Sequence, residues 1–286
     1  MPTLTLATWN LRRPAAQPNA RSATLRQHID RVAADVWVLT ETHDSITPGD
    51  GYAAVSTTGT DRAHWPGERW VTIWSRWPIE RLAATGDPER AVAARVIVES
   101  EVGSREASAS AGTDGERGLI VYGTVLPWIG SVWRDIPWRD GAFAAALETQ
   151  AADWRALRAA YPKDDLFVLG DLNQDLVDGP PHYYGSRANR RLLLEALGSA
   201  GLIAVTGGDG DPVRRGAGPE MQGAACIDHI CMPKPSTLAS ESESTRARWR
   251  AGAAWRWPDG ARSELRGVSD HFGVAVRVSD GGQGWR

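Results

Sequence analysis

A short apolar strand that ends in Gly-Asp-Leu-Asn is the feature that most constrains this chain. The apolar run 166–169 predicts a buried strand. Gly170 breaks the run, and Asp171 and Asn173, two positions apart, then project to the same side of the extended chain. A carboxylate can bind a metal ion or accept a proton, and an amide can hold a phosphate oxygen or a water molecule. Taken alone, however, the fragment is better read as a turn or a helix cap.

Three other fragments also place polar side chains next to strands. Asn10 closes an N-terminal strand, and Glu41 follows the apolar run 36–39. Near the other end of the chain, Asp270 and His271 precede a strand in which apolar and polar residues alternate. A rigid sheet can hold such groups in fixed positions. Four coincidences of this kind in one chain are hard to attribute to turn chemistry, so together they predict a functional site.

In order and spacing, these fragments resemble the motifs of the endonuclease/exonuclease/phosphatase family, which includes apurinic endonucleases, deoxyribonuclease I, sphingomyelinases and inositol-polyphosphate 5-phosphatases. The matching fragments are Thr8–Asn10, Leu39–Glu41, Gly170–Asn173, Cys226–Ile230 and Ser269–His271. The match runs from residue 10 to residue 271 of 286. The resemblance implies an α/β (α+β) fold of four layers, in which two mixed β-sheets pack face to face, helices lie outside, and the site is at one sheet edge.

The positions of the motifs also predict the domain organisation. By length alone, 286 residues could form one large domain or two of ordinary size. Because the first and last motifs lie near opposite ends of the chain, one site requires nearly all of it. We therefore expect a single domain over residues 1–279 and a polar tail over 280–286. With 42% hydrophobic residues and 14 tryptophans, the chain has ample material for a large core.

Helix and strand patterns alternate along the chain. A helix is expected after a cap at Asn19 or Ser22, and two more over 143–160 and 189–200. Strands are expected at 3–8, 36–39, 52–58, 69–75, 94–98, 119–126 and 166–169, and from 272 onward. Residues 99–118, rich in small and charged side chains, are expected to form a hairpin tip.

Charge and cysteine content limit the partners and the location. The formal net charge is 32 minus 35, or −3, so the chain lacks the broad basic character of duplex-binding proteins. Cys226 and Cys231 are five apart, so an extended chain points them to opposite faces and they should not form a disulfide. Reduced thiols and an N-terminus without a signal-peptide pattern favour the cytoplasm, and no apolar stretch predicts a membrane span. The sequence does not decide the oligomeric state.

The resemblance implies that some candidate residues bind a metal ion. Glu41 and Asp270 would be ligands, and Asn10 would support the metal or the phosphate through its side-chain amide. Mg²⁺ is the expected cofactor, with Mn²⁺ as the alternative, because hard cations prefer oxygen ligands. The six histidines show no zinc-like spacing.

Four further residues are implied to act on the phosphate and the water. Asp171 would position or deprotonate the attacking water, and Asn173 would hold a non-bridging phosphate oxygen. His271 would contact the phosphate, and Asp228 would hydrogen-bond the other ring nitrogen and raise the proton affinity of the histidine. We therefore expect Asp228 and His271 to be hydrogen-bonded partners.

The sequence departs from the family pattern near residue 125. Many relatives carry a His or Tyr there that contacts the phosphate, whereas this chain has Val125. The missing contact could come from Thr124, from Trp128, from another loop or from another histidine, such as His43, two residues beyond Glu41. The departure leaves the chemistry of the leaving group open.

The function implied by the resemblance is metal-dependent hydrolysis of a phosphodiester in DNA or RNA by in-line attack of water. Arg187, Arg190, Arg191 and Tyr183 follow the Gly-Asp-Leu-Asn motif and could hold phosphates and stack on a base, although a solvated helix start explains them equally well. A phosphorylated small molecule or a phospholipid is the alternative substrate, which the small net charge makes credible. A catalytically silent binding module is a third interpretation, against which the seven retained polar motif residues argue.

Overall fold

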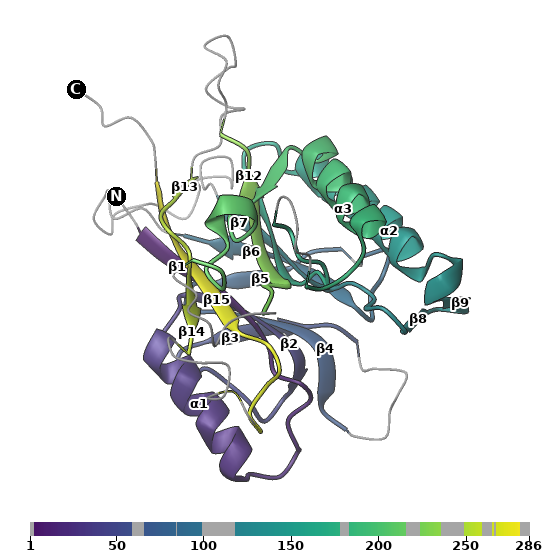
Figure 1. The fold of residues 1–286 in the computed structure, drawn as a ribbon. Helices are drawn as coiled ribbons and strands as arrows, with labels where there is room; N and C mark the ends of the chain where they lie inside the picture. The colour runs from purple at the N-terminus through teal and green to yellow at the C-terminus, as the bar shows by residue number, and fades with distance from the viewer. Residues whose placement is uncertain are drawn as a thin grey trace, which may run out of the picture.

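The computed structural model describes residues 3–58, 66–83, 85–98, 118–177, 183–215, 224–235, 249–258, 265 and 267–280. Two mixed β-sheets pack face to face around a large core, and helix α1 (Ala20–Val32) adds Leu25 and Ile29 to this core. Helices α2 (Ala142–Ala160) and α3 (Arg187–Ser199) cover the second sheet and enclose a separate core (Figure 1). The predicted four-layer α/β sandwich with helices outside is confirmed.

The first sheet joins the two ends of the chain. Its strands run in the order β13 (Trp249–Ala251), β15 (Gly273–Asp280), β1 (Thr3–Asn10), β2 (Val36–His43), β4 (Glu68–Ser75) and β3 (Ala53–Ser56), with β14 (Trp255–Trp257) also paired to β15. Strand β1 is antiparallel to β15 and parallel to β2, and Asn10 lies opposite Thr40. The end of β1 therefore lies between Glu41 and the residues that precede β15.

The second sheet places two carboxylates side by side. Its order is β11 (Leu202–Ala204), β12 (Asp228–Pro233), β10 (Asp165–Asp171), β7 (Gly118–Val125), β6 (Ala91–Ile97) and β5 (Ile79–Arg81). Strands β10 and β12 are antiparallel, and their register sets Asp171 directly opposite Asp228. Opposed residues in an antiparallel pair bring their side chains close together. A separate hairpin of β8 (Val132–Trp133) and β9 (Ile136–Pro137) follows β7.

Strand β10 is apolar on both sides because it is covered on both sides. Phe167 and Leu169 belong to the core between the sheets, whereas Leu166 and Val168 pack beneath α2 and α3. A strand buried on both faces has a continuous apolar run in place of an alternating pattern. The same alternation separates Cys226, which lies in the first core, from Cys231, which lies in the second, and both thiols are free as predicted.

Side-chain caps fix where the helices begin. Asn19 accepts a hydrogen bond from the Ser22 backbone at 2.8 Å, and the Ser22 hydroxyl accepts one from the Asn19 backbone at 2.8 Å, so both predicted caps take part in one capping box. Helix α3 begins two residues before the predicted start, because Ser186 accepts a hydrogen bond from the Asn189 backbone at 3.1 Å. This places Arg187 on the helix.

Three other expectations depend on the ends of the described ranges. Residues 99–117 of the predicted hairpin tip lie outside them. Of the predicted tail, Asp280 still belongs to β15, and 281–286 lie outside the described residues. The single domain over 1–279 stays a prediction. Within the described ranges, no helix is long and apolar enough to cross a membrane.

Gly170 is expected to be essential for the end of β10. Its φ of +141° is one that side-chain-bearing residues rarely adopt, and an added Cβ would lie 1.9 Å from the Thr124 carbonyl oxygen. We expect Gly170→Ala to lower the free energy of unfolding by about 3 kcal/mol, the upper part of the usual range for overpacking. Urea denaturation measures this change. At Gly198 in α3, an added Cβ would meet no atom within 4 Å outside the adjoining helix backbone. Gly198→Ala should therefore raise the free energy of unfolding by up to about 1 kcal/mol. Equal effects of the two substitutions would show that the close approach of Gly170 to Thr124 does not limit this position.

Candidate active site

The side-chain amide of Asn10 connects the two sheets at the edge where the motifs meet. Its Nδ2 donates to Glu41 Oε1 at 3.2 Å and to Asp171 Oδ2 at 3.0 Å, although Asp171 is 161 positions away in the sequence. Asn10 and Asp171 are each 1% exposed. A buried amide bound to two carboxylates stabilises their negative charge only in part. The arrangement therefore concentrates acidic oxygens at one sheet edge.

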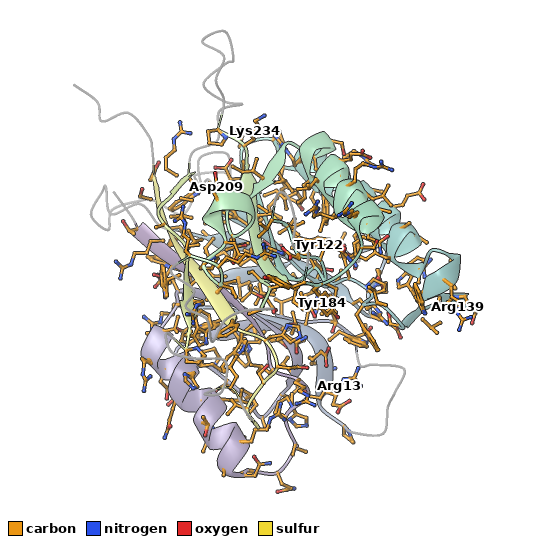
Figure 2. The ribbon with its side chains drawn as sticks, in the orientation of Figure 1. Arg13, Tyr122, Arg139, Tyr184, Asp209 and Lys234 are labelled. Carbon is orange, nitrogen blue, oxygen red and sulfur yellow. The ribbon has the colours of Figure 1, made fainter. Side chains whose placement is uncertain are left out.

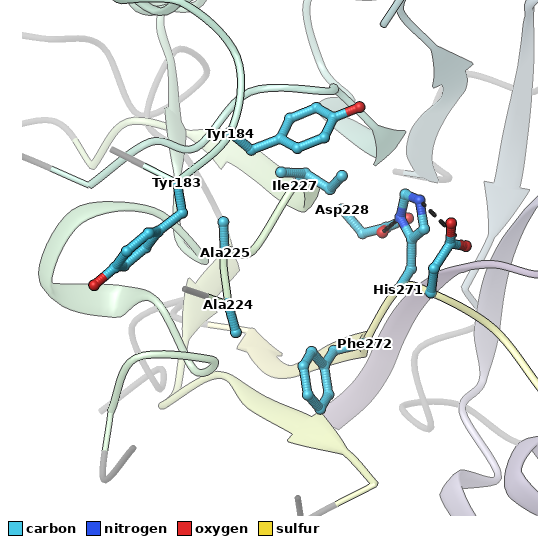
Figure 3. A pocket seen from close by; sticks show the side chains of 9 residues that line it. Tyr183, Tyr184, Ala224, Ala225, Ile227, Asp228, His271 and Phe272 are labelled. Atoms are coloured by element: carbon cyan, nitrogen blue, oxygen red, sulfur yellow. Dashed lines mark hydrogen bonds and ion pairs between the residues drawn. The ribbon is translucent and has the colours of Figure 1, made fainter. Parts of the chain in front are cut away.

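His271 forms the predicted hydrogen bond with Asp228. Its Nδ1 lies 2.5 Å from Asp228 Oδ2, and since an ionised carboxylate can only accept, Nδ1 carries the proton (Figure 3). The backbone around the histidine is held by the end of β1: Trp9 Nε1 donates to the His271 carbonyl at 3.0 Å. The Ser269 hydroxyl donates to the Asn10 carbonyl at 2.8 Å. These bonds position the ring so that Nε2 remains available at the pocket.

The pKa values of Asp171 and His271 shift because the site is buried and rich in charge. Burial raises the pKa of Asp171, and Asp228 and Glu41 add to this effect against the opposing influence of His271, giving a pKa of about 8. Burial alone lowers the pKa of His271, but the neighbouring carboxylates of Asp228 and Asp171 outweigh it and raise the pKa to about 10. The imidazole is therefore a cation at neutral pH, and the nearby carboxyl group of Asp171 readily takes up a proton.

The donor set fits a divalent cation. Asp171, Asp228 and His271 each bring a side-chain oxygen or ring nitrogen within 4.8 Å of the other two. A cationic imidazole has no lone pair for a metal ion, so the two carboxylates are the candidate ligands of this group. Asp228 Oδ1 is buried and finds no hydrogen-bond partner among the described residues. The hydrogen bonds from Asn10 and Arg13 to Glu41, at 3.2 and 3.3 Å, are long and leave its carboxylate able to bind an ion. Several carboxylate oxygens at one place are the ligands that hard cations prefer.

The two predicted metal ligands adjoin different members of this cluster. Glu41 adjoins Asp171 through Asn10, whereas Asp270 adjoins His271, with Oδ1 4.0 Å from the histidine Nε2. Asp270 also lies 3.9 Å from Arg12 Nε and is half exposed. That Glu41 and Asp270 share one ion stays a prediction.

Sequence reasoning missed the two arginines that follow the first motif. Arg13 Nε lies 3.3 Å from Glu41 Oε2, and its guanidinium lies 4.7 Å from the centre of the Trp70 ring. Arg12 approaches Asp270. The signal was present, since both directly follow Trp-Asn-Leu, but only the fold shows which acid each arginine faces. Glu41 itself has a left-handed φ of 43°, an uncommon conformation that is often found at functional sites.

The contacts around Val125 show which of the residues suggested from the sequence could still contact the phosphate. Val125 lies in the core between the sheets. The Thr124 hydroxyl donates to Gln150 Oε1 at 2.6 Å, and both ring nitrogens of His43 are engaged, by Ser45 and by the Pro66 carbonyl. Thr124 and His43 therefore do not supply the missing contact. Of the named residues this leaves Trp128, whose side chain is 51% exposed.

A pocket opens beside His271 and contains only part of the predicted substrate-binding group. Its described lining is Tyr183, Tyr184, Ala224, Ala225, Ile227, Asp228, Asp270, His271 and Phe272 (Figure 3). This lining includes Tyr183, over whose ring the Arg214 guanidinium lies at 4.7 Å, but none of the three predicted arginines. Arg187 is exposed on α3, Arg190 donates to the Val177 carbonyl, and Arg191 pairs with Glu195 at 3.7 Å.

The sequence profile of the Endonuclease/Exonuclease/phosphatase family matches residues 7–271. The chain belongs to this family. The match covers every motif on which the resemblance depended, so the predicted membership is confirmed. No curated protein matches the chain.

Solved structures share the fold at low sequence identity. The AP endonuclease LMAP from Leishmania major is 13% identical, with a TM-score of 0.61, over 96% of this chain and 87% of its own. The 3′ phosphatase NExo from Neisseria, bound to a product DNA hairpin, is 17% identical, with a TM-score of 0.60, over 96% and 98%. Sphingomyelinase C from Streptomyces griseocarneus is 17% identical, with a TM-score of 0.54, over 97% and 99%. At these identities the likeness shows the fold.

Family membership gives the class of reaction. Enzymes of the endonuclease/exonuclease/phosphatase family are metal-dependent phosphoric ester hydrolases, and this chain is one of them. The acidic cluster around Asp171 can bind a metal ion. In Figure 2, the labels of Tyr184 and Arg13, which lie near the acidic residues, are close to the middle of the view. Lys234, which follows the opposite end of β12, is at the top.

Proposed function

We propose that this chain hydrolyses a phosphodiester of DNA or RNA by in-line attack of water, with Mg²⁺, or alternatively Mn²⁺, as its cofactor. The observation that carries the proposal is the continuous set of contacts at the sheet edge. Asn10 bonds Asp171 and Glu41, and Asp228 bonds His271 and lies opposite Asp171. This arrangement brings a proton acceptor, a cation and oxygen ligands to one place, which is what phosphoester cleavage requires.

Asp171 accepts the proton of the attacking water or holds that water in line. Its carboxyl group is buried, Oδ2 is fixed by Asn10, and Oδ1 accepts from the Asn173 backbone at 3.0 Å. Without a metal ion its pKa of about 8 keeps the carboxyl group largely neutral at pH 7. A cation bound beside it would favour the ionised carboxylate, which can accept a proton. Asn173 stays the proposed contact to a non-bridging oxygen, and its own amide is positioned by the Leu126 carbonyl at 2.8 Å.

His271 stabilises negative charge on the phosphate. Asp228 holds the imidazole at Nδ1 and keeps it cationic, so Nε2 can donate to a phosphoryl oxygen. Glu41, Asp270 and Asn10 would hold the metal ion, together with Asp171 where its carboxylate is ionised. When bound, the ion would neutralise charge on the phosphoryl oxygens.

A phospholipid or phosphorylated small molecule is retained as a second substrate class because apolar side chains are exposed on the segment that follows Leu126. Leu126 contacts Asn173, and the segment just after it exposes Trp128, Ile129, Val132 and Trp138 by 39% to 52%. Exposed large apolar side chains mark an interaction surface where they form a patch. The fold itself occurs in an AP endonuclease and in a sphingomyelinase, so it favours neither class.

The proposal also covers the substrate contacts and the location of the protein. Tyr183 remains a proposed substrate contact because it lines the pocket, whereas the role of Arg187, Arg190 and Arg191 stays a prediction without a contact to the pocket. We also infer a cytoplasmic location, which the two free buried thiols of Cys226 and Cys231 support.

Chelation tests the proposed reaction. After treatment with EDTA, the rate of hydrolysis should fall by at least about 10³-fold, because a metal ion contributes several kcal/mol to charge stabilisation and each 1.36 kcal/mol is worth about tenfold. Added Mg²⁺ or Mn²⁺ should restore it. The substrates are single- and double-stranded DNA, RNA, sphingomyelin vesicles and inositol phosphates.

The substrate panel separates the interpretations. Cleavage of nucleic acid supports the leading proposal. Hydrolysis restricted to vesicles or inositol phosphates favours the second substrate class. Binding without hydrolysis of any substrate, at any divalent cation, would show a silent binding module and refute the proposed function.

A further inference from the structure

Tyr184 reaches the active site from the segment that follows the Gly-Asp-Leu-Asn motif. Its hydroxyl donates to Asn173 Oδ1 at 3.2 Å, and its ring extends over the pocket with the hydroxyl on the side of His271 (Figure 3). Asn173 also bonds the carbonyl of Leu126, immediately after Val125. The tyrosine therefore brings a polar ring to the part of the site where β7 supplies only a buried valine.

The backbone of Tyr184 is fixed by groups next to the motif. The Tyr183 backbone donates to Asp175 Oδ2 at 3.1 Å, and the Ser186 backbone donates to Gln174 Oε1 at 3.1 Å. Asp175, which is 1% exposed, is itself held by an ion pair with Arg214 at 2.5 Å. The ring is thus positioned by a buried network before any substrate arrives. Such preorganisation is what makes a hydrogen-bond donor effective in catalysis.

The hydroxyl of Tyr184 is suited to donate to an anionic oxygen. Burial and the nearby carboxylates, led by Asp171 and Asp270, raise its pKa to about 12, so it keeps its proton at neutral pH. Its present hydrogen bond, to a neutral amide oxygen at 3.2 Å, is long. A bond to an ionised acceptor is shorter and roughly twice as strong. A phosphoryl oxygen would therefore compete well with Asn173 for this donor.

We propose that Tyr184 is a catalytic residue whose hydroxyl donates a hydrogen bond to a non-bridging oxygen of the phosphoryl group under attack, in place of a polar ring at Val125. The inference rests on the proposed phosphoesterase function. It assigns Tyr184 a role distinct from base stacking, because the essential part is the hydroxyl and the ring alone is not sufficient.

Tyr184→Phe tests the role of the hydroxyl while retaining the ring. We expect kcat/KM for the cleaved phosphodiester to fall by about 100-fold, the lower end of the range for removal of one oxyanion donor. The thermal unfolding midpoint should stay close to that of the wild type. Tyr161→Phe, at the C-terminal end of α2, is the matched control and should leave kcat/KM unchanged.

A phosphorothioate substrate distinguishes direct contact from positioning of Asn173. Sulfur is a poor hydrogen-bond acceptor, so when it replaces the contacted oxygen, the Tyr184→Phe effect should shrink by about tenfold or more. The diastereomer with sulfur at the other non-bridging position should keep the full effect. Comparing wild type with variant on the same diastereomer and the same metal cancels any effect of sulfur on metal binding.

The outcomes separate this inference from the function on which it rests. An active wild type with an unaffected Tyr184→Phe variant would overturn the catalytic role alone. An equal loss on both diastereomers would overturn direct contact with one oxygen. No further loss from Tyr184→Phe in an Asn173→Ala background would show that Tyr184 acts only by holding Asn173, which also overturns the catalytic role. A wild type that hydrolyses no phosphoester with any divalent cation would overturn the proposed function, and this inference with it.

Discussion

Replacing His271 by alanine is expected to lower kcat by about 10³-fold, within the usual range for loss of a group that transfers a proton or stabilises charge. The imidazole is 12% exposed, and Asp228 keeps it cationic at neutral pH. Removing it leaves the phosphate without this positive charge and leaves Asp228, which is 1% exposed, without its ring partner. Steady-state kinetics with saturating Mg²⁺ measures the loss.

His271→Asn is the matched control for the alanine variant. An asparagine amide can keep a donor near the position of Nδ1, so the bond to Asp228 can persist, but nothing replaces Nε2. We expect both variants to be inactive, whereas only the alanine variant should lose about 1–3 kcal/mol of stability, the cost of a buried acceptor without a partner. Near wild-type turnover in either variant would refute the proposed role of the histidine.

Local patterns predicted much of the fold because the forces that set those elements act within short segments. Strand β10 was predictable since both of its faces are buried and every position from Leu166 to Leu169 must therefore be apolar. Helix α1 was predictable since Asn19 and Ser22 satisfy each other's backbone within one turn. The motif residues Asn10 and Asp171 were recognised because each ends a strand, whereas Asp228 was recognised because Cys226–Ile230 resembles a family motif.

Residues that depend on long-range contacts were missed or misplaced. Tyr184 is brought to Asn173 by the network of Asp175 and Arg214, and no spacing in the sequence indicates that contact. The cap at Ser186 places Arg187 on an exposed turn of α3, and its predicted role in binding the substrate stays a prediction. Alternation along a strand would have assigned Val125 to a face, yet only the packing of the two sheets shows that this face is the core.

Asp171→Asn is expected to abolish catalysis and to change how stability depends on pH. The amide cannot accept a proton from water, so kcat should fall by about 10²–10⁴-fold. The amide retains an oxygen that can accept from the Asn173 backbone, but its nitrogen cannot accept from Asn10. That lost hydrogen bond should cost about 1 kcal/mol at every pH. A wild-type rate in this variant would contradict the role of Asp171 as acceptor or orienter of the water.

The charge of Asp171 makes a second contribution to the free energy of unfolding, and this one depends on pH. Its pKa rises from 3.8 in the unfolded chain to about 8 in the metal-free fold, so between these values the folded state holds a proton that the unfolded state has released. Ionisation of Asp171 therefore opposes folding increasingly from pH 4 to pH 8, by up to about 1.4 kcal/mol per pH unit. Asparagine does not ionise, so the variant lacks this effect. In EDTA, Asp171→Asn should be less stable than the wild type at pH 4 and more stable at pH 8. Urea denaturation across this range measures the difference, and a difference independent of pH would show that the buried carboxyl group is not held in its neutral form.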